Sequence, residues 1–119
     1  VILGLPFETR EMMLQTVKYV GAVTDGIKLQ NLQVLKDTPL SELYDKGEVV
    51  LFERDEYIDL LCDCLSILPK NVVVHRLTGD PPKNLLIAPK WCLDKKVTLN
   101  AITKAFSERG VEQGKDSDF

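Results

Sequence analysis

Hydrophobic and polar residues alternate strictly over a short stretch in the first third of the chain. After a turn signal at residues 25–26, apolar Ile27 and Leu29 alternate with polar Lys28 and Gln30. Side chains two residues apart share one face of a strand, so the pattern predicts a strand with one apolar and one polar face. Such a strand is typical of a barrel with a polar, ligand-holding interior, or of an antiparallel sheet with one face in water.

The residues before this stretch have the pattern of a strand followed by a helix. Residues 1–5 (VILGL) are a continuous apolar run, which predicts a strand covered on both faces. Thr9 is a suitable N-cap for a helix whose buried stripe is Met13, Val17 and Val20, spaced i, i+4 and i+7. Strand, helix and strand in succession predict a βαβ unit with parallel strands and a right-handed crossover.

The middle of the chain repeats this order. Thr38 precedes a short helix over residues 39–46, and a stronger helix opens within residues 53–56 and ends at Pro69. The buried stripe of the stronger helix is Tyr57 or Ile58, Leu61, Leu65 and Leu68. The β-branched residues 72–76 then predict a third strand, which completes a second βαβ unit.

The C-terminal part is less regular. Residues 85–88 are a short apolar piece whose type the pattern leaves open. A last helix is predicted over residues 98–109, with Gly110 as its C-cap. Its buried side is expected to hold Leu99, Ile102 and Phe106. We expect one structured unit over residues 1–110, followed by a polar, frayed tail over residues 111–119.

Composition narrows the class of protein. A chain of 119 residues, 45% hydrophobic and 28% charged, has the make-up of one soluble globular domain. The net charge of -3 and the absence of a basic stripe argue against general nucleic-acid binding. No apolar run approaches the roughly 20 residues of a membrane span. Three cysteines without framework spacing, and no signal-peptide pattern, predict a cytoplasmic protein.

Candidate chemistry gathers where the predicted strands end. Ligands of parallel α/β sheets bind at the carboxyl ends of the strands, where loops and helix N-termini converge. Residues 4–9, 32–38 and 75–80 fall there. The first of these stretches offers a flexible glycine and free helix amides to an anion, although it also reads as a plain βα turn.

The stretch 75–80 is the most polar of the three. His75 is the only histidine and, beside Arg76 and Asp80, it could relay a proton or orient a substrate. The alternative is a hydrogen-bonded histidine at a strand end and an ion pair between Arg76 and Asp80 that holds the loop. The role of Lys28 and Gln30 is open in the same way: their side chains either line a ligand cavity or face solvent.

The cysteines do not form a metal motif. Cys62 and Cys64 are two residues apart on a predicted helix, so their side chains point about 160° away from each other. Cys92 has no cysteine or histidine at ligand spacing. We therefore predict buried thiols and no metal site in this chain.

Several motifs, in order, resemble those of the radical S-adenosylmethionine (radical SAM) enzymes. Residues 2–6 (ILGLP), followed by residues 8–9, resemble the later part of the G-x-I-x-G-x-P strand motif of that superfamily. Residues 26–40, with residues 43–47, are similar to its next strand and the loop that follows. Residues 74–91 resemble the C-terminal part of an uncharacterised Fe-S oxidoreductase subgroup akin to the Elongator catalytic subunit.

This resemblance implies a fold and a set of cofactors. The chain would be the C-terminal part of a partial (β/α)6 TIM-like barrel, with about three parallel strands and flanking helices. S-adenosylmethionine (SAM) and a [4Fe-4S] cluster would be bound by the full-length protein and not held stably by this chain. Ile2 and Gly4 would lie on the adenine side of SAM, and the backbone of Gln33, Val34 and Leu35 would meet the adenine edge.

The chain departs from the family pattern at three positions. Phe7 stands where a glycine is expected after the proline, and Asp37 also replaces a usual glycine. Gln33 stands where histidine is usual. Phe7 thus puts a tight turn in doubt, and Gln33 weakens any role of that side chain.

The resemblance implies an enzyme whose full-length form generates a 5′-deoxyadenosyl radical and abstracts hydrogen from an unknown substrate. This chain alone would be inactive, because the cluster-binding C-x3-C-x2-C loop belongs to a missing N-terminal part of the barrel. The alternative is a non-catalytic α/β module that binds a ligand or another protein. A barrel without its first strands would leave residues 1–5 as an exposed apolar edge, so we also expect a homodimer or higher oligomer.

Overall fold

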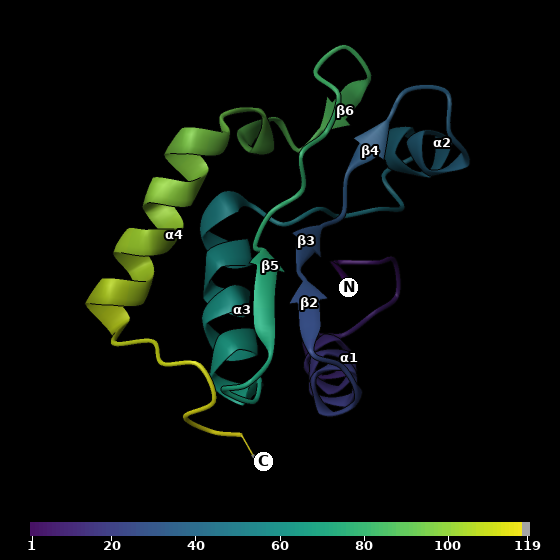
Figure 1. Cartoon of the computed structure of the whole chain (residues 1–119). Coiled ribbons are helices and arrows are strands. Elements are labelled where there is room, and N and C mark those ends of the chain that lie inside the picture. Colours follow the sequence, from purple (N-terminus) through teal and green to yellow (C-terminus); the bar gives the residue numbers. More distant parts are fainter. Residues whose placement is uncertain (118–119) are drawn as a thin grey trace.

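The computed structural model describes residues 1–117 and consists of short strands that alternate with helices (Figure 1). In chain order the elements are β1 (Ile2–Leu3), α1 (Arg10–Val23), β2 (Gly26–Lys28), β3 (Gln30–Asn31), β4 (Val34–Leu35), α2 (Pro39–Asp45), α3 (Arg54–Ile67), β5 (Val73–Arg76), β6 (Leu86–Ala88), the 3-10 helix η1 (Lys90–Leu93) and α4 (Lys95–Arg109). The protein is therefore of mixed α/β class, as the alternating patterns predict.

The central stretch formed by β2 and β3 pairs with a parallel strand on each side. β1 pairs with β3, and β5 pairs with β2, in both cases in parallel. Leu29 lies between β2 and β3, and its amide donates to the carbonyl of Arg76 at 2.8 Å. The amide of Gln30, the first residue of β3, donates to the carbonyl of Val1 at 3.1 Å. The order across the strands is thus β1, then β2 and β3, then β5. Both predicted βαβ units are confirmed as pairs of parallel neighbours.

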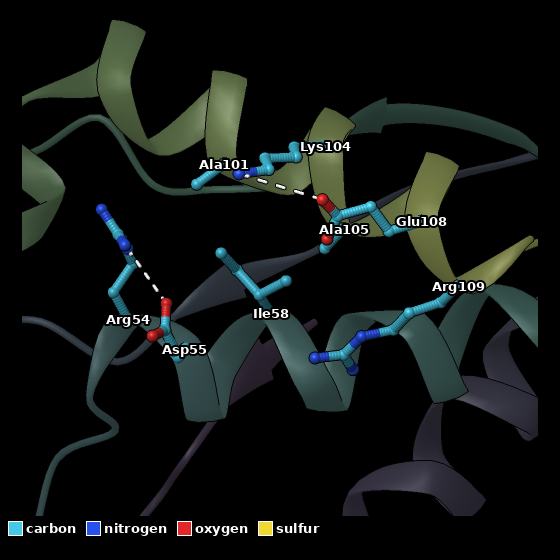
Figure 2. A pocket seen from close by; sticks show the side chains of 8 residues that line it. All are labelled: Arg54, Asp55, Ile58, Ala101, Lys104, Ala105, Glu108 and Arg109. Carbon is cyan, nitrogen blue, oxygen red and sulfur yellow. Dashed lines mark hydrogen bonds and ion pairs between the residues drawn. The ribbon is translucent and has the colours of Figure 1, made fainter.

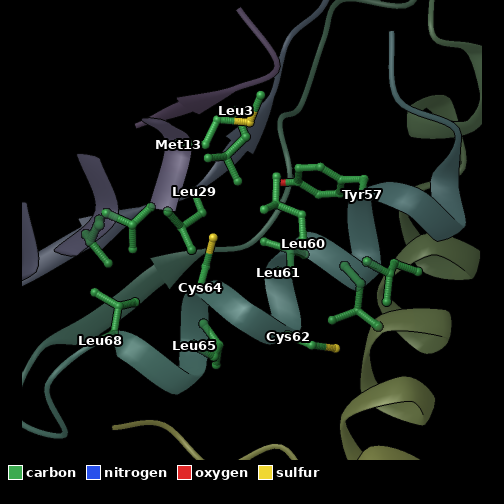
Figure 3. Packing of buried hydrophobic residues seen from close by; sticks show 14 of the residues in the cluster. Leu3, Met13, Leu29, Tyr57, Leu60, Leu61, Cys62, Cys64, Leu65 and Leu68 are labelled. Carbon is green, nitrogen blue, oxygen red and sulfur yellow. The ribbon is translucent and has the colours of Figure 1, made fainter. Parts of the chain in front are cut away.

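One face of these strands is covered by helices, and the main core lies there. Leu3 and Leu29 are fully buried and belong to one cluster with Met13 of α1 and with Leu61 of α3 (Figure 3). α4 packs on the side of α3 away from the strands and adds Ile102 to the cluster (Figure 1). The predicted stripes of α1 and α3 are confirmed, apart from Val20, which is only half-buried.

Local capping determines where the helices begin and end. The Thr9 side chain accepts a hydrogen bond from the Met12 amide at 3.2 Å, so α1 has the N-cap that its sequence predicts. Thr38 caps α2 in the same way by accepting from Ser41. Gly110 ends α4 in the left-handed region with φ 60°.

The expectation that the first strand is covered on both faces is wrong. Leu3 is buried, but the exposed fraction of Ile2 is 38%. The two side chains point to opposite faces of β1, and helices cover only one of these faces. Within residues 1–117, β1 also has a strand partner on one side only.

The last helix differs from its predicted form. α4 begins at Lys95, three residues before the expected start, because the Asp94 side chain accepts a hydrogen bond from the Val97 amide. Leu99, expected on the buried side, has an exposed fraction of 37%. Thr98 is buried instead, since its hydroxyl donates to the carbonyl of Trp91 at 3.1 Å.

The segment after α4 is docked rather than frayed over residues 111–117. The amide of Gly114 donates to the carbonyl of Leu65 at 3.0 Å. The Gln113 side chain donates to the carbonyls of Pro69 at 2.9 Å and Val72 at 2.7 Å. The prediction of a frayed tail is therefore wrong for these residues, while residues 118–119 lie outside the described part of the chain. The division at residue 110 stays a prediction.

A second, antiparallel strand pair lies beside α2. β4 pairs with β6, with Val34 opposite Ala88 and Leu35 opposite Leu86. The apolar piece whose type the sequence left open is thus a strand. No helix within residues 1–117 has the length and apolar character needed to cross a membrane.

Candidate functional site

The carboxyl ends of β3 and β5 are joined by a buried side chain, Asn31. This residue has an exposed fraction of only 3% and continues the inward series that begins with Ile27 and Leu29. Its Oδ1 accepts a hydrogen bond from the amide of Gly79 at 3.5 Å, and its Nδ2 donates to the carbonyl of Leu32 at 3.4 Å. Asn31 therefore holds the loop after β5 close to the end of β3. It was not among the sequence candidates, although a polar residue in an apolar series would have indicated it.

Gln33 lies directly against the same loop. A Cβ atom at Gly79 would lie 2.1 Å from Nε2 of Gln33, so only glycine fits there without a shift. Within residues 1–117, this Nε2 is a buried donor without a hydrogen-bond partner. Buried polar groups are normally satisfied. The strand ends thus present one donor that a ligand acceptor or a small movement of the loop could satisfy.

Three aromatic rings pack together beside the loop that follows β5. The ring centroid of Tyr57 lies 5.6 Å from that of Trp91 and 6.3 Å from that of Phe52. The Tyr57 hydroxyl donates to the carbonyl of Leu77 at 2.7 Å, and Trp91 Nε1 donates to that of Phe52 at 2.9 Å. Burial, with a smaller contribution from Cys64, raises the pKa of Tyr57 far above its usual range. Tyr57 is therefore a neutral hydrogen-bond donor that anchors the loop after β5.

Gly4 is covered by this aromatic group. A Cβ atom on Gly4 would lie 3.1 Å from the ring of Phe52, and the φ angle of Gly4 is 100°. The residue is thus a close-approach point between the loop after β1 and the segment before α3. Phe52 of the same chain lies where a side chain of residue 4 would begin, while Gly4 itself is half-buried.

The turn after β1 forms although glycine is missing from it. The amide of Glu8 donates to the carbonyl of Leu5 at 3.2 Å, and Phe7 has φ 67°. Proline in the second position and a positive φ in the third are typical of a type II turn. The doubt that Phe7 raised about a tight turn is thereby resolved. Asp37 likewise replaces glycine at a positive φ of 60°.

The polar candidates of the strands are only partly brought together. Lys28 and His75, which are exposed residues of β2 and β5, line one open hollow of about 330 Å³, to which Val20 of α1 also contributes. Gln30 is half-buried and lies opposite Ile2 in the register. Val1, just before β1, and Gly26, the first residue of β2, also line the hollow, which reaches Lys28 at the end of β2 and His75 near the end of β5.

Arg76 and Asp80 do not form the ion pair considered as an alternative. Asp80 lies near Lys95 at the start of α4, with 3.8 Å between Oδ2 and Nζ. Arg76 stands opposite Lys28 in the pairing of β5 with β2 and is exposed. The roles of these side chains in a reaction stay predictions.

The three thiols are buried and separate. Burial raises the pKa of Cys64 to about 12, and it also raises the pKa values of Cys62 and Cys92. The Asn31 side chain acts in the opposite direction on Cys92. Among residues 1–117, no group of three histidine, cysteine or acidic side chains is placed to hold a metal ion.

A separate hollow of about 310 Å³ lies between α3 and α4 (Figure 2). Ile58 and the small side chains of Ala101 and Ala105 lie among charged residues there. These charges are largely paired with one another: Arg54 with Asp55 at 3.2 Å, and Lys104 with Glu108 at 3.8 Å. The charged groups thus satisfy each other, and we assign no ligand to this hollow.

The fold defines the class: a mixed α/β unit with parallel strand pairs, in which the loops that follow the strands are where ligands of such folds usually bind. Residues 24–108 match the radical SAM C-terminal domain family, and the chain belongs to this family. The resemblance seen in the sequence motifs is thereby confirmed.

Relatives and a solved structure agree with this assignment. The chain is 44% identical over 116 residues to uncharacterized protein YtqA of Bacillus subtilis, which covers 97% of this chain. It is 35% identical over 116 residues (96% of this chain) to an uncharacterized protein of Methanocaldococcus jannaschii, and 28% identical over 112 residues (93%) to protein YhcC of Escherichia coli. The chain spans 36% of the length of each of these relatives.

The archaeal Elp3 of Methanocaldococcus infernus, solved with an N-terminal deletion, matches the fold with a TM-score of 0.76. The match covers 94% of this chain and 26% of that chain at 21% sequence identity. This likeness concerns the fold alone, and it supports a unit that recurs as one part of a longer protein.

Proposed function

We propose that this chain is the C-terminal part of the catalytic barrel of a radical SAM enzyme. The observation that carries the proposal is the family match over residues 24–108. When bound, SAM and a reduced [4Fe-4S] cluster supply a 5′-deoxyadenosyl radical for hydrogen abstraction.

The uncovered face of the strands is, in this proposal, part of the wall of a (β/α)6 barrel. Ile2 and Val73 lie on that face with exposed fractions of 38% and 56%. Lys28 and Gln30 alternate with buried residues and point to the same side. A strand with one face on helices and one face on a mixed polar and apolar interior is typical of a barrel. An upstream segment of the same barrel would pair with the free edge of β1.

Features of the carboxyl edge support contacts with the adenosine part of SAM. Within residues 1–117 the Nε2 of Gln33 is a buried donor without a partner, and Ile2 offers apolar surface on the uncovered face. Gly4 is half-buried, and the ring of Phe52 lies where a side chain of residue 4 would begin. We therefore propose adenosine contacts for Ile2, for Gly4 and for the segment from Gln33 to Leu35.

A free strand edge also supports self-association of the chain when it is expressed alone. Its β1 carries backbone groups that have no partner on one side within residues 1–117. Such an edge is a template for pairing with a second copy. The same edge would be closed in a longer protein that supplies the missing strand.

The proposal is tested with a longer protein in which an upstream segment precedes this chain. After anaerobic purification and reduction with dithionite, incubation with SAM should release 5′-deoxyadenosine, measured by liquid chromatography and mass spectrometry. Release should be lost when the cysteines of an upstream C-x3-C-x2-C motif are replaced by alanine. A longer protein that lacks such a motif and releases no 5′-deoxyadenosine would instead support a non-catalytic binding module.

A further inference from the structure

The register of β2 and β5 contains an irregularity that places positive side chains together. Ile27 is opposite Val74, but the next residue, Lys28, is opposite Arg76. His75 is therefore an extra residue on β5, which is the arrangement of a β-bulge. Bulges are rare between parallel strands and often re-aim side chains beside ligand sites.

A glycine makes room for the histidine at this bulge. A Cβ atom on Gly26 would lie 2.6 Å from Nε2 of His75, so the imidazole lies over the backbone of β2. His75 and Lys28 then line the same open hollow of about 330 Å³. The remaining lining comes from Val1, Val20, Gly26 and Ile27, none of which carries a charged side chain.

These three side chains have no acidic partner in the described chain. Within residues 1–117, no carboxylate forms an ion pair with Lys28, His75 or Arg76. This contrasts with the hollow between α3 and α4, where Arg54 and Lys104 each have an acidic partner. An ammonium group, an imidazole and a guanidinium are all hydrogen-bond donors that suit an oxyanion.

We propose that Lys28, His75 and Arg76 form a binding site for an oxyanion, a phosphate or carboxylate group whose apolar neighbour rests against Val20 and Ile27. The site is built on two paired strands: His75 lines the hollow with Lys28, and Arg76 does not line it but stands opposite Lys28 in the register. Neither Gln33 nor Gly79 lines this hollow, so the site is distinct from the contact between those two residues. The proposal therefore does not depend on SAM chemistry.

The test uses the single histidine as a reporter. The chain is prepared with an acetylated α-amino group, so that a charge on Val1 does not contribute, and it is titrated with inorganic phosphate or with acetate at constant ionic strength. We expect saturable shifts of the His75 ring signals and of the amides of residues 26–28, with a dissociation constant on the order of millimolar. Whichever of the two anions binds more tightly identifies the oxyanion class.

Variants that each remove one positive charge distinguish a specific binding site from general electrostatic attraction of the anion to the protein. Lys28→Gln and Arg76→Gln should each weaken binding about threefold to tenfold, the range for loss of a charged hydrogen bond at a partly solvated site. Lys104→Gln removes an equal charge from α4 and should leave binding unchanged. Equal weakening by Lys104→Gln, or shifts that rise linearly without saturation, would overturn the proposal. A variant whose amide spectrum shows unfolding is replaced by His75→Gln, which should also weaken binding.

Discussion

Replacing Phe7 with glycine should stabilise the protein, because Phe7 adopts a backbone conformation that favours glycine. Its φ angle is 67°, and its side chain is 96% exposed, so the ring makes little contact with the rest of the chain. A left-handed conformation costs an L-residue about 1–2 kcal/mol. Glycine avoids this cost but loses about 0.4–1 kcal/mol through the greater freedom of its unfolded state. The expected net gain is about 0.5–1 kcal/mol in the free energy of unfolding.

The control for this prediction is Phe7→Ala. Alanine removes the exposed ring but keeps a Cβ atom, and therefore the strain, so its free energy of unfolding should match that of the parent. Urea unfolding followed by far-UV circular dichroism measures both variants, and the glycine variant should also melt about 2–5 °C higher. The reasoning is refuted if Phe7→Gly is no more stable than Phe7→Ala.

Two further predictions concern the carboxyl edge and the core. Gly79→Ala should destabilise the chain by about 1 kcal/mol, because the new Cβ atom would lie 2.1 Å from Nε2 of Gln33; the cost should nearly vanish in a Gln33→Ala background, and equal costs in both backgrounds would contradict the contact. The Cys64 thiol, whose pKa burial raises from 9.0 to about 12, stays neutral in the folded state while it ionises in the unfolded chain. The free energy of unfolding should therefore fall as pH rises above 9.0, by up to about 1.4 kcal/mol per pH unit from this group. A Cys64→Ala variant should show a slope that is shallower by about one proton, and identical slopes in parent and variant would contradict this account.

Much of the helical and strand structure could be predicted because burial on one face imposes a period on the sequence. Met13 and Val17 indicate the buried side of α1, and Thr9 indicates its start through a local hydrogen bond. Ile27 and Leu29 indicate the inward face of the central strand in the same way. These signals lie within a few residues of one another, so they need no knowledge of the rest of the fold.

The features that escaped prediction depend on contacts between distant parts of the chain. β4 and β6 stabilise each other as a pair, and neither is long enough to have a pattern of its own. The partner of Asp80 is Lys95 rather than nearby Arg76, because the path of the loop brings Asp80 to the start of α4.

The same limit applies to the candidate site. The bulge that makes His75 an extra residue is visible only once β2 and β5 are paired. The close approach of Gln33 to Gly79 likewise exists only after the two strand ends have met. In contrast, the burial of Asn31 could have been anticipated from its place in the alternation.

Iron binding is the most direct test of the proposal that this chain supplies the C-terminal part of a radical SAM barrel. The chain alone and a longer protein with its upstream segment are reconstituted anaerobically with iron and sulfide, and iron and sulfide are then measured per chain. We expect about four irons per chain and the electron paramagnetic resonance signal of a reduced [4Fe-4S] cluster in the longer protein. We expect no stoichiometric cluster in the chain alone, because Cys62, Cys64 and Cys92 are buried apart from one another. A stable cluster in the chain alone, or none in the longer protein, would contradict the account.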